Sequence, residues 1–163
     1  MIRIQDGDFN IGEEIAALRL DPTGKLRTEI GAIITFTGTV RDTLPEGAGE
    51  IFTLTLEHYP GMTEAELERI EAEARARWPL QAATIIHRYG DLAPGDDIVL
   101  VVTASAHRHA AFDAAAFLMD FLKSRAPFWK KEAAAGDKGS WVDARETDDA
   151  ALSRWRKPSG DAT

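Results

Sequence analysis

Apolar residues recur along the chain with two periods, and these periods predict its strands and helices. A two-residue period is typical of a β-strand, because successive side chains point to opposite faces. Residues 31–40 show this period clearly and are rich in β-branched side chains. Residues 97–105 are apolar almost without interruption, so we expect a central strand that is buried on both faces. The predicted strands are 2–4, 31–40, 52–59, 82–88, 97–105 and 141–142.

Three segments show the 3.6-residue period of an amphipathic helix. One begins at Asn10, which is a favourable N-cap residue. A second begins at a predicted capping box formed by Thr63 and Glu66, and Pro79 ends it. The third, from about residue 109 to 125, is apolar on nearly all sides. We expect a sheet to bury one side of this helix, and a second subunit is a candidate for covering another.

Strands and helices are interspersed without strict alternation, which predicts the α+β class with a mixed or antiparallel sheet and packed helices. The chain has 163 residues, no internal repeat and no linker that would divide it. Residues 1–155 are therefore expected to form a single domain. Residues 156–163 are expected to be a frayed C-terminal tail, and the polar loop 43–50 is expected to be mobile.

The composition excludes several classes of protein. The chain contains no cysteine, which rules out a disulfide framework, a thiolate metal site and a persulfide carried by the chain itself. It lacks a signal-like start and any apolar run close to the roughly 20 residues of a membrane-spanning helix. Its net charge of -8 opposes binding to a nucleic-acid backbone. We expect a cytoplasmic protein that binds neither nucleic acid nor membranes.

Residues 104–132 collect positive charge against this acidic background. Five basic and two acidic side chains lie within 104–131, a balance of +3 in a chain of net charge -8, so the remainder carries -11. Concentrated cations repel one another and lose solvation unless an anion lies among them. The charge distribution therefore predicts an anion-binding pocket built from this stretch.

His107 and Arg108 stand where the strand 97–105 ends and the long helix begins. Backbone N–H groups and the helix dipole favour an anion there, and a guanidinium can hold phosphate or carboxylate oxygens with two hydrogen bonds. The alternative is that Arg108 pairs with a surface carboxylate while His107 is an ordinary core residue. Lys123, near the far end of the helix, also has a structural alternative, because the dipole favours a cation at that end.

The segment after the long helix contains two adjacent lysines. Pro127 ends the helix, and Phe128 and Trp129 are expected to anchor the chain by burial. Lys130 and Lys131 are then held on a defined turn. Adjacent lysines usually point in different directions and are commonly both solvated, but the aromatic anchors favour a place for one of them in a pocket.

Other candidate residues give weaker signals. Arg41 follows the strand 31–40 and is able to offer its guanidinium to the same ligand. No carboxylate completes a metal-ligand spacing with the histidines, so we expect no metal and no cofactor. Ser105 lacks the G-x-S-x-G context of a serine nucleophile. The histidines are His58, His87, His107 and His109.

Six sequence blocks occur in order over nearly the whole chain, up to about Trp155. They are GAIITFTGTVRD, LEHYPGM, IIHRYGDLAPGD, SAHRHAAFDAAAFLMDFLK, APFWKKE and WVDARE. Each block is modest alone, and together they resemble the family of large, catalytic subunits of molybdopterin synthase. The resemblance implies an α/β hammerhead fold. It also implies a homodimer at the centre of a heterotetramer, with a ubiquitin-like small subunit at each outer end.

The reaction implied by this resemblance is a sulfur transfer in molybdenum cofactor biosynthesis. Cyclic pyranopterin monophosphate is converted into molybdopterin by the addition of two dithiolene sulfurs. The sulfur arrives as a thiocarboxylate at the C-terminal glycine of the small subunit, which agrees with the absence of cysteine from this chain.

The resemblance also implies a set of site residues. Lys123 is expected to lie closest to the sulfur-delivering carbonyl, orienting it and moving protons. Lys130 is expected to support the pterin at the carbon that is substituted. The expected catalytic residues are Lys123 and Lys130, and the expected substrate-binding residues are Thr39, Val40, Arg41, His107, Arg108, Lys131 and Glu132. Arg41, His107 and Arg108 would hold the phosphate, and Arg145 is a further candidate across the dimer interface.

Two alternatives use the same cations without this chemistry. A non-catalytic module would bind a phosphate ligand or a ubiquitin-like tail, so pterin and partner would bind but no dithiolene would form. A purely structural dimer would instead pair its basic cluster with its own acidic residues.

Overall fold

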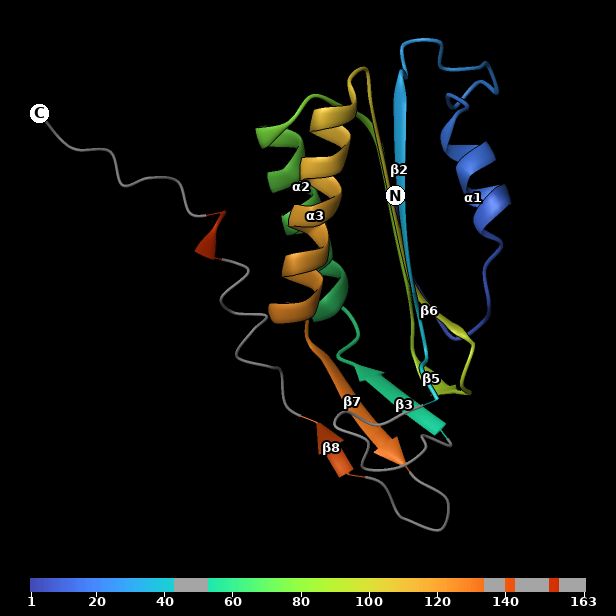
Figure 1. Cartoon of the computed structure of the whole chain (residues 1–163), viewed down its shortest axis with the longest axis vertical. Helices are drawn as coiled ribbons and strands as arrows, with labels where there is room; N and C mark the ends of the chain where they lie inside the picture. Colours follow the sequence, from blue (N-terminus) through green and yellow to red (C-terminus); the bar gives the residue numbers. More distant parts are fainter. Residues whose placement is uncertain (43–52, 134–139, 143–152, 156–163) are drawn as a thin grey trace, which may run out of the picture.

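The computed structural model describes residues 1–42, 53–133, 140–142 and 153–155. These residues form three α-helices and two four-stranded sheets (Figure 1). The helices are α1 (Ile11–Leu18), α2 (Met62–Arg77) and α3 (Arg108–Ser124). The strands are β1 (Ile2–Gln5), β2 (Ala32–Thr39), β3 (Thr53–His58), β4 (Leu80–Arg88), β5 (Gly90–Leu92), β6 (Asp97–Ser105), β7 (Phe128–Ala133) and β8 (Ser140–Val142). None of these helices is long and apolar enough to cross a membrane.

The larger sheet has the strand order β1-β4-β6-β2 and carries the core on both of its faces. β1 pairs with β4 in parallel, and the other pairs are antiparallel. As predicted, β6 is a central strand and is buried from Val99 to Ser105. Val101 packs with Phe117 on the side of α2 and α3, while Leu100 packs with Leu18 on the side of α1 (Figure 1). Because both faces are buried, the strand shows no polar alternation.

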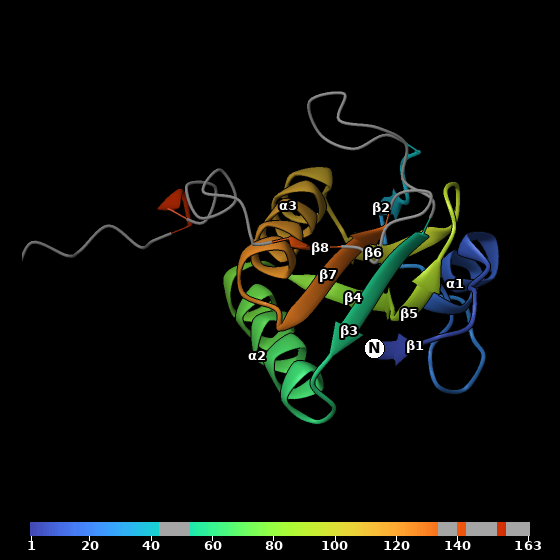
Figure 2. The same cartoon turned by 90° about the horizontal axis from the view of Figure 1, so that it is seen from below.

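The smaller sheet has the order β5-β3-β7-β8 and is antiparallel throughout. Leu54, Leu56 and Leu92 form a small core with Val40, the residue that follows β2. Seen from below, β3 and β7 lie side by side in front of the larger sheet (Figure 2). The mixed and antiparallel pairing predicted from the sequence is confirmed. β5 was not predicted, because Gly90 suggested a turn.

A connection of three residues joins α3 to β7, and it corrects one prediction. The helix ends at Ser124 and the strand begins at Phe128. Lys130 and Lys131 therefore lie on a strand and not on a turn, because the main chain of β7 pairs with β3 and β8 at both residues. Trp129 is 46% exposed, so of the two predicted aromatic anchors only Phe128 packs into the interior.

The start of α2 also differs from the prediction. The N-cap is Gly61, and the Glu64 carboxylate accepts a hydrogen bond from the Gly61 N–H at 2.6 Å. Thr63 is fully buried, and its hydroxyl donates to the Tyr59 carbonyl at 3.0 Å. The predicted capping box is thus replaced by a single bond from Gly61 to Glu64, because Gly61 has no side chain to complete a box and the Thr63 hydroxyl bonds to Tyr59.

The long helix α3 is buried on several sides by its own chain, and its further cover by a second subunit stays a prediction. Phe117, Leu118 and Leu122 face the interior, but Phe112 is 57% exposed. Among the described residues, a sheet, α2 and the indole of Trp155 cover parts of α3. The exposed phenyl ring leaves an apolar position on the surface.

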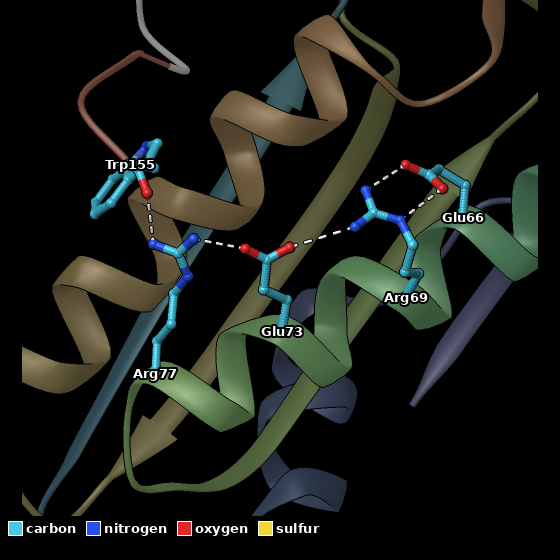
Figure 3. A network of polar contacts seen from close by, with 5 residues as sticks. All are labelled: Glu66, Arg69, Glu73, Arg77 and Trp155. Atoms are coloured by element: carbon cyan, nitrogen blue, oxygen red, sulfur yellow. Dashed lines mark hydrogen bonds and ion pairs between the residues drawn. The ribbon is translucent and has the colours of Figure 1, made fainter. Parts of the chain in front are cut away.

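A chain of polar contacts runs along the side of α2 next to α3 and ends at Trp155 (Figure 3). Arg69 pairs with Glu66 at 2.6 Å and with Glu73 at 3.3 Å. Arg77 pairs with Glu73 at 2.6 Å and donates to the Trp155 carbonyl at 2.7 Å. Exposed pairs of this spacing contribute only about 0.3–0.5 kcal/mol each. The contact with Trp155 additionally fixes a distant part of the chain on α2.

The indole of Trp155 packs onto the two helices. Its ring lies edge-on to Phe117 and Trp78, with ring centroids 5.5 and 5.6 Å away. Its Nε1–H donates to Asp120 of α3 at 2.6 Å. The predicted domain end at residue 155 is therefore part of the packed structure, whereas the predicted tail 156–163 and loop 43–50 lie outside the described residues.

We expect Trp155→Ala to lower the free energy of unfolding by about 2–3 kcal/mol, because it removes half-buried aromatic packing and one hydrogen bond. Urea unfolding at one protein concentration would measure the loss. The matched control is Arg154→Ala, which removes an exposed ion pair to Asp120 and should cost less than about 1 kcal/mol. Equal effects of the two substitutions would contradict an anchoring role for the indole.

Candidate active site

A cavity of about 310 Å³ lies where the two sheets and the C-terminal end of α3 meet. Its lining comes from β2, β3, β4, β6, α3 and β7. The buried part is apolar and includes Val40, Leu54 and Leu122, whereas Arg41 and Lys123 are exposed at its edge. This volume is in the range that holds one small ligand. The site combines an apolar floor with a cationic rim.

Arg41 is placed at the rim by the irregular end of β2. The pairing of β2 with β6 shifts register between Gly38 and Thr39. A β-carbon at Gly38 would lie 2.8 Å from Cγ1 of Val99, so only glycine allows this close approach. Beyond the shift, Val40 donates to the Asp96 carbonyl at 2.9 Å and accepts from Gly95 N–H at 2.8 Å. These bonds hold the backbone from which Arg41 projects.

Lys123 and Lys130 are brought together by the short connection between α3 and β7. Lys123 lies in the last turn of α3, and Lys130 lies on β7 with its side chain half-buried. Both line the cavity. Lys131 does not line it, because adjacent side chains of a strand point to opposite faces. Glu132 is paired through its main chain with Leu54.

The predicted site residues thus fall into two groups. Thr39, Val40, Arg41, Lys123 and Lys130 line one cavity. His107 is the N-cap of α3 and Arg108 is its first residue, and both are exposed at the opposite end of that helix. Fifteen residues separate Arg108 from Lys123, which at 1.5 Å per residue is about 22 Å. Within one chain, the two groups do not meet. Arg145 lies outside the described residues.

Ion pairing among the described residues does not account for three of the predicted site cations. Arg41, Arg108 and Lys123 have no ion-pair partner among the residues that the structure describes. Charged side chains left without partners at a cavity rim are available to an anionic ligand. In the same described residues, no group of three or more His, Cys, Asp or Glu side chains is arranged to hold a metal ion.

Sequence reasoning missed His87 as a lining residue of the cavity. It is 9% exposed and stacks on Phe128, with ring centroids 3.7 Å apart and an interplanar angle of 17°. Its Nδ1 lies 2.8 Å from the Arg88 carbonyl oxygen. The sequence did contain a signal for the burial of His87. It lies two residues after Ile85 and therefore on the same face of a predicted strand.

Burial is the main cause that lowers the pKa of His87 to about 4; the hydrogen bond to Arg88 opposes this shift, and the nearby His58 adds to it. Transfer of the imidazolium into the interior would cost its solvation. His87 is therefore a neutral imidazole at physiological pH, beside a rim of cations.

Comparisons with known proteins agree with this architecture. The profile of the MoaE protein family matches residues 4–125. The molybdopterin synthase catalytic subunit of Mesorhizobium japonicum is 55% identical over 159 residues, covering 97% of this chain and 94% of that protein. The molybdopterin biosynthesis MoaE protein from Burkholderia ambifaria matches in structure with a TM-score of 0.78 at 51% identity, covering 95% of this chain and 97% of that one.

A more distant structure has the same fold. Molybdopterin synthase from Staphylococcus aureus matches with a TM-score of 0.75 at 28% identity, covering 86% of this chain and 95% of that one. The chain belongs to the MoaE protein family. The predicted family, the predicted fold class and the prediction of an enzyme of molybdenum cofactor biosynthesis are thereby confirmed.

The lowered pKa of His87 predicts sensitivity to acid. Between pH 6.5 and about 4 the unfolded chain takes up a proton on His87 and the folded chain does not, so the free energy of unfolding falls as the pH falls through this range. The loss should reach about 2–3 kcal/mol near pH 4.5. Urea unfolding of the wild type and of His87→Phe at pH 7 and pH 4.5 would measure it. The variant should lack this part of the loss, and identical losses would contradict a buried neutral imidazole.

Proposed function

We propose that the cavity is the site where cyclic pyranopterin monophosphate receives sulfur and becomes molybdopterin. The observation that carries the proposal is the meeting of Arg41, Lys123 and Lys130 around one apolar-floored cavity. Substrate phosphate and a thiocarboxylate are both anions, and they repel each other unless cations lie between them. Hydrogen bonds to charged groups contribute about 1.5–3 kcal/mol each, so a few of them are enough to hold both reactants.

The sulfur donor in this proposal is the thiocarboxylated C-terminus of a ubiquitin-like small subunit. This chain has no cysteine, so it has no thiol of its own to carry sulfur. The name of the Mesorhizobium relative, a catalytic subunit, is consistent with a further subunit. In each transfer the sulfur would bond to a carbon of the pterin side chain as a C–O bond of that carbon breaks, and water would then hydrolyse the acyl–sulfur bond, so that the small subunit ends as a carboxylate.

Each lysine has a distinct role in the proposal. Lys123, exposed at the rim, would orient the acyl carbonyl and move protons as the sulfur leaves. Lys130, half-buried on β7, would support the pterin at the carbon that is substituted. Thr39 and Val40 would contact the substrate beside Arg41, whose guanidinium would hold phosphate oxygens. Lys131 and Glu132 remain predicted substrate contacts, and the cytoplasmic location remains a prediction.

A homodimer would complete the site. Arg108, Phe112, Met119 and Lys123 are spaced so that they lie along one stripe of α3. The exposed Phe112 in this stripe is suited to a subunit contact. In a two-fold contact that covers the stripe with the two helices antiparallel, Arg108 of each copy approaches Lys123 of the other. The phosphate-binding pair His107 and Arg108 would then reach the cavity of the second copy.

We expect Lys123→Ala to reduce molybdopterin formation by about a hundredfold or more, because it removes a charge that acts on the reacting carbonyl. The assay combines the purified chain, a thiocarboxylated small subunit and cyclic pyranopterin monophosphate, and detects the product by mass spectrometry. Lys25→Ala, an exposed lysine in a surface turn, is the matched control and should retain full activity. Full activity of Lys123→Ala would remove Lys123 from the mechanism.

The same assay separates the enzyme from the non-catalytic binding module. Binding of both pterin and small subunit by the wild type, without formation of a dithiolene, would favour the binding module. The structural-dimer alternative has less support, because Arg41 and Lys123 have no carboxylate partner among the residues that the structure describes.

Complementation tests whether two copies share one site. Inactive Lys123→Ala and inactive Arg108→Ala chains would be mixed under conditions that exchange subunits. If the site is shared, each hybrid dimer contains one intact site, and activity should return to a substantial fraction of the wild type. If each chain builds its own site, every site in the hybrid keeps one defect, and no activity returns. Each variant remixed with itself is the control.

A further inference from the structure

His87 has a buried imidazole whose hydrogen-bonding capacity is only half used. The Arg88 carbonyl can only accept a hydrogen bond, so the contact of 2.8 Å at Nδ1 means that Nδ1 carries the proton. A neutral imidazole has one N–H, which leaves Nε2 as an acceptor. Among the described residues, Nε2 has no hydrogen-bond partner.

The position of the ring gives this acceptor access to the cavity. His87 lies on the face of β4 that packs toward α3 and lines the cavity with Lys123 and Lys130. Stacking on Phe128 fixes the plane of the ring, and the bond at Nδ1 fixes its rotation. Because Nδ1 is bound to the main chain of β4, Nε2 is on the edge of the ring farther from that main chain.

A hydrogen-bond acceptor in the buried floor of the cavity is unusual beside a rim of cationic side chains. Lysine and arginine side chains only donate hydrogen bonds, so Arg41, Lys123 and Lys130 recognise anions. Among the described lining side chains, His87 and the hydroxyl of Thr39 are the oxygen or nitrogen acceptors. A reactant that places an anionic end at the rim and an N–H group in the floor would satisfy both.

We propose that His87 is a substrate-positioning residue, whose Nε2 accepts a hydrogen bond from an N–H group of a reactant held in the cavity. This inference rests on the proposed function, and two reactants offer such a group. The pterin carries ring and amino N–H groups, and the tail of the small subunit carries peptide N–H groups. A neutral imidazole suits either N–H donor. An imidazolium at this place would repel the rim cations and could not accept a hydrogen bond.

The test measures two affinities for the wild type, His87→Phe and His87→Gln. Calorimetry gives the dissociation constant for cyclic pyranopterin monophosphate without the small subunit, and separately for the carboxylate form of the small subunit. His87→Phe keeps an aromatic ring against Phe128 but removes the acceptor, so it should weaken one of the two affinities by about three- to tenfold. His87→Gln places an amide oxygen near the position of Nε2 and should recover most of the loss.

The matched control is His58→Phe. His58 also neighbours Phe128, with ring centroids 6.3 Å apart, but does not line the cavity. Both affinities should therefore remain within about twofold of the wild type. Urea unfolding at pH 7 should show that all variants are folded.

The outcomes separate the possibilities. Weaker pterin binding in His87→Phe, recovered in His87→Gln, supports a pterin N–H donor, and the same pattern for the small subunit supports a peptide donor. Unchanged affinities, or equal losses in both variants, would overturn the role of the acceptor. Failure of the wild type to bind either reactant would instead remove the proposed function, and this inference with it.

Discussion

The stacking of Phe128 on His87 is the contact on which the arrangement of the site depends. Phe128 begins β7 in the smaller sheet, and His87 lies on β4 in the larger sheet, so one pair of rings ties the two sheets together. The three residues between α3 and β7 leave little freedom once this contact forms. The hydroxyl of Thr63 lies 3.3 Å from the Pro127 carbonyl and joins the start of α2 to the same corner. As a result, Lys123 and Lys130 face one cavity although they belong to different elements.

Different residues of the cavity exclude water and provide positive charge. The two roles would conflict if the same residues had both. Apolar side chains such as Leu54 and Leu122 exclude water from the floor, which strengthens electrostatic interactions nearby. The cations stay at the rim, where Arg41 and Lys123 keep enough exposure to remain charged without a buried partner. His87 fits this division, because burial favours its neutral form. In the proposed function an anionic reactant would be held at the opening, while its uncharged part would reach inward.

The length of α3 sets a limit on what one chain can do. A helix of 17 residues holds its two cationic ends apart, and no side-chain motion closes a gap of about 22 Å. A second copy turned by a two-fold axis removes this limit without any change in the fold. The exposed Phe112 on the stripe between Arg108 and Lys123 is consistent with such a contact. The acidic side chains that give the chain its net charge of -8 would then lie on other parts of the surface, away from anions at the site.

The sequence by itself determined most of the elements, the family and the candidate residues Arg41, Lys123 and Lys130. Period-two alternation and a continuous apolar run predicted β2 and the central β6, because side-chain burial along a strand is a local pattern. Local patterns do not determine which strands pair. The sequence therefore suggested a turn where β7 pairs with β3, a buried Trp129 where the side chain is exposed, and a single cluster where, within one chain, His107 and Arg108 lie far from Lys123. Only the tertiary structure places His87 in the lining of the cavity. Its position depends on the Phe128 ring of the other sheet and on a cavity formed by six separate elements.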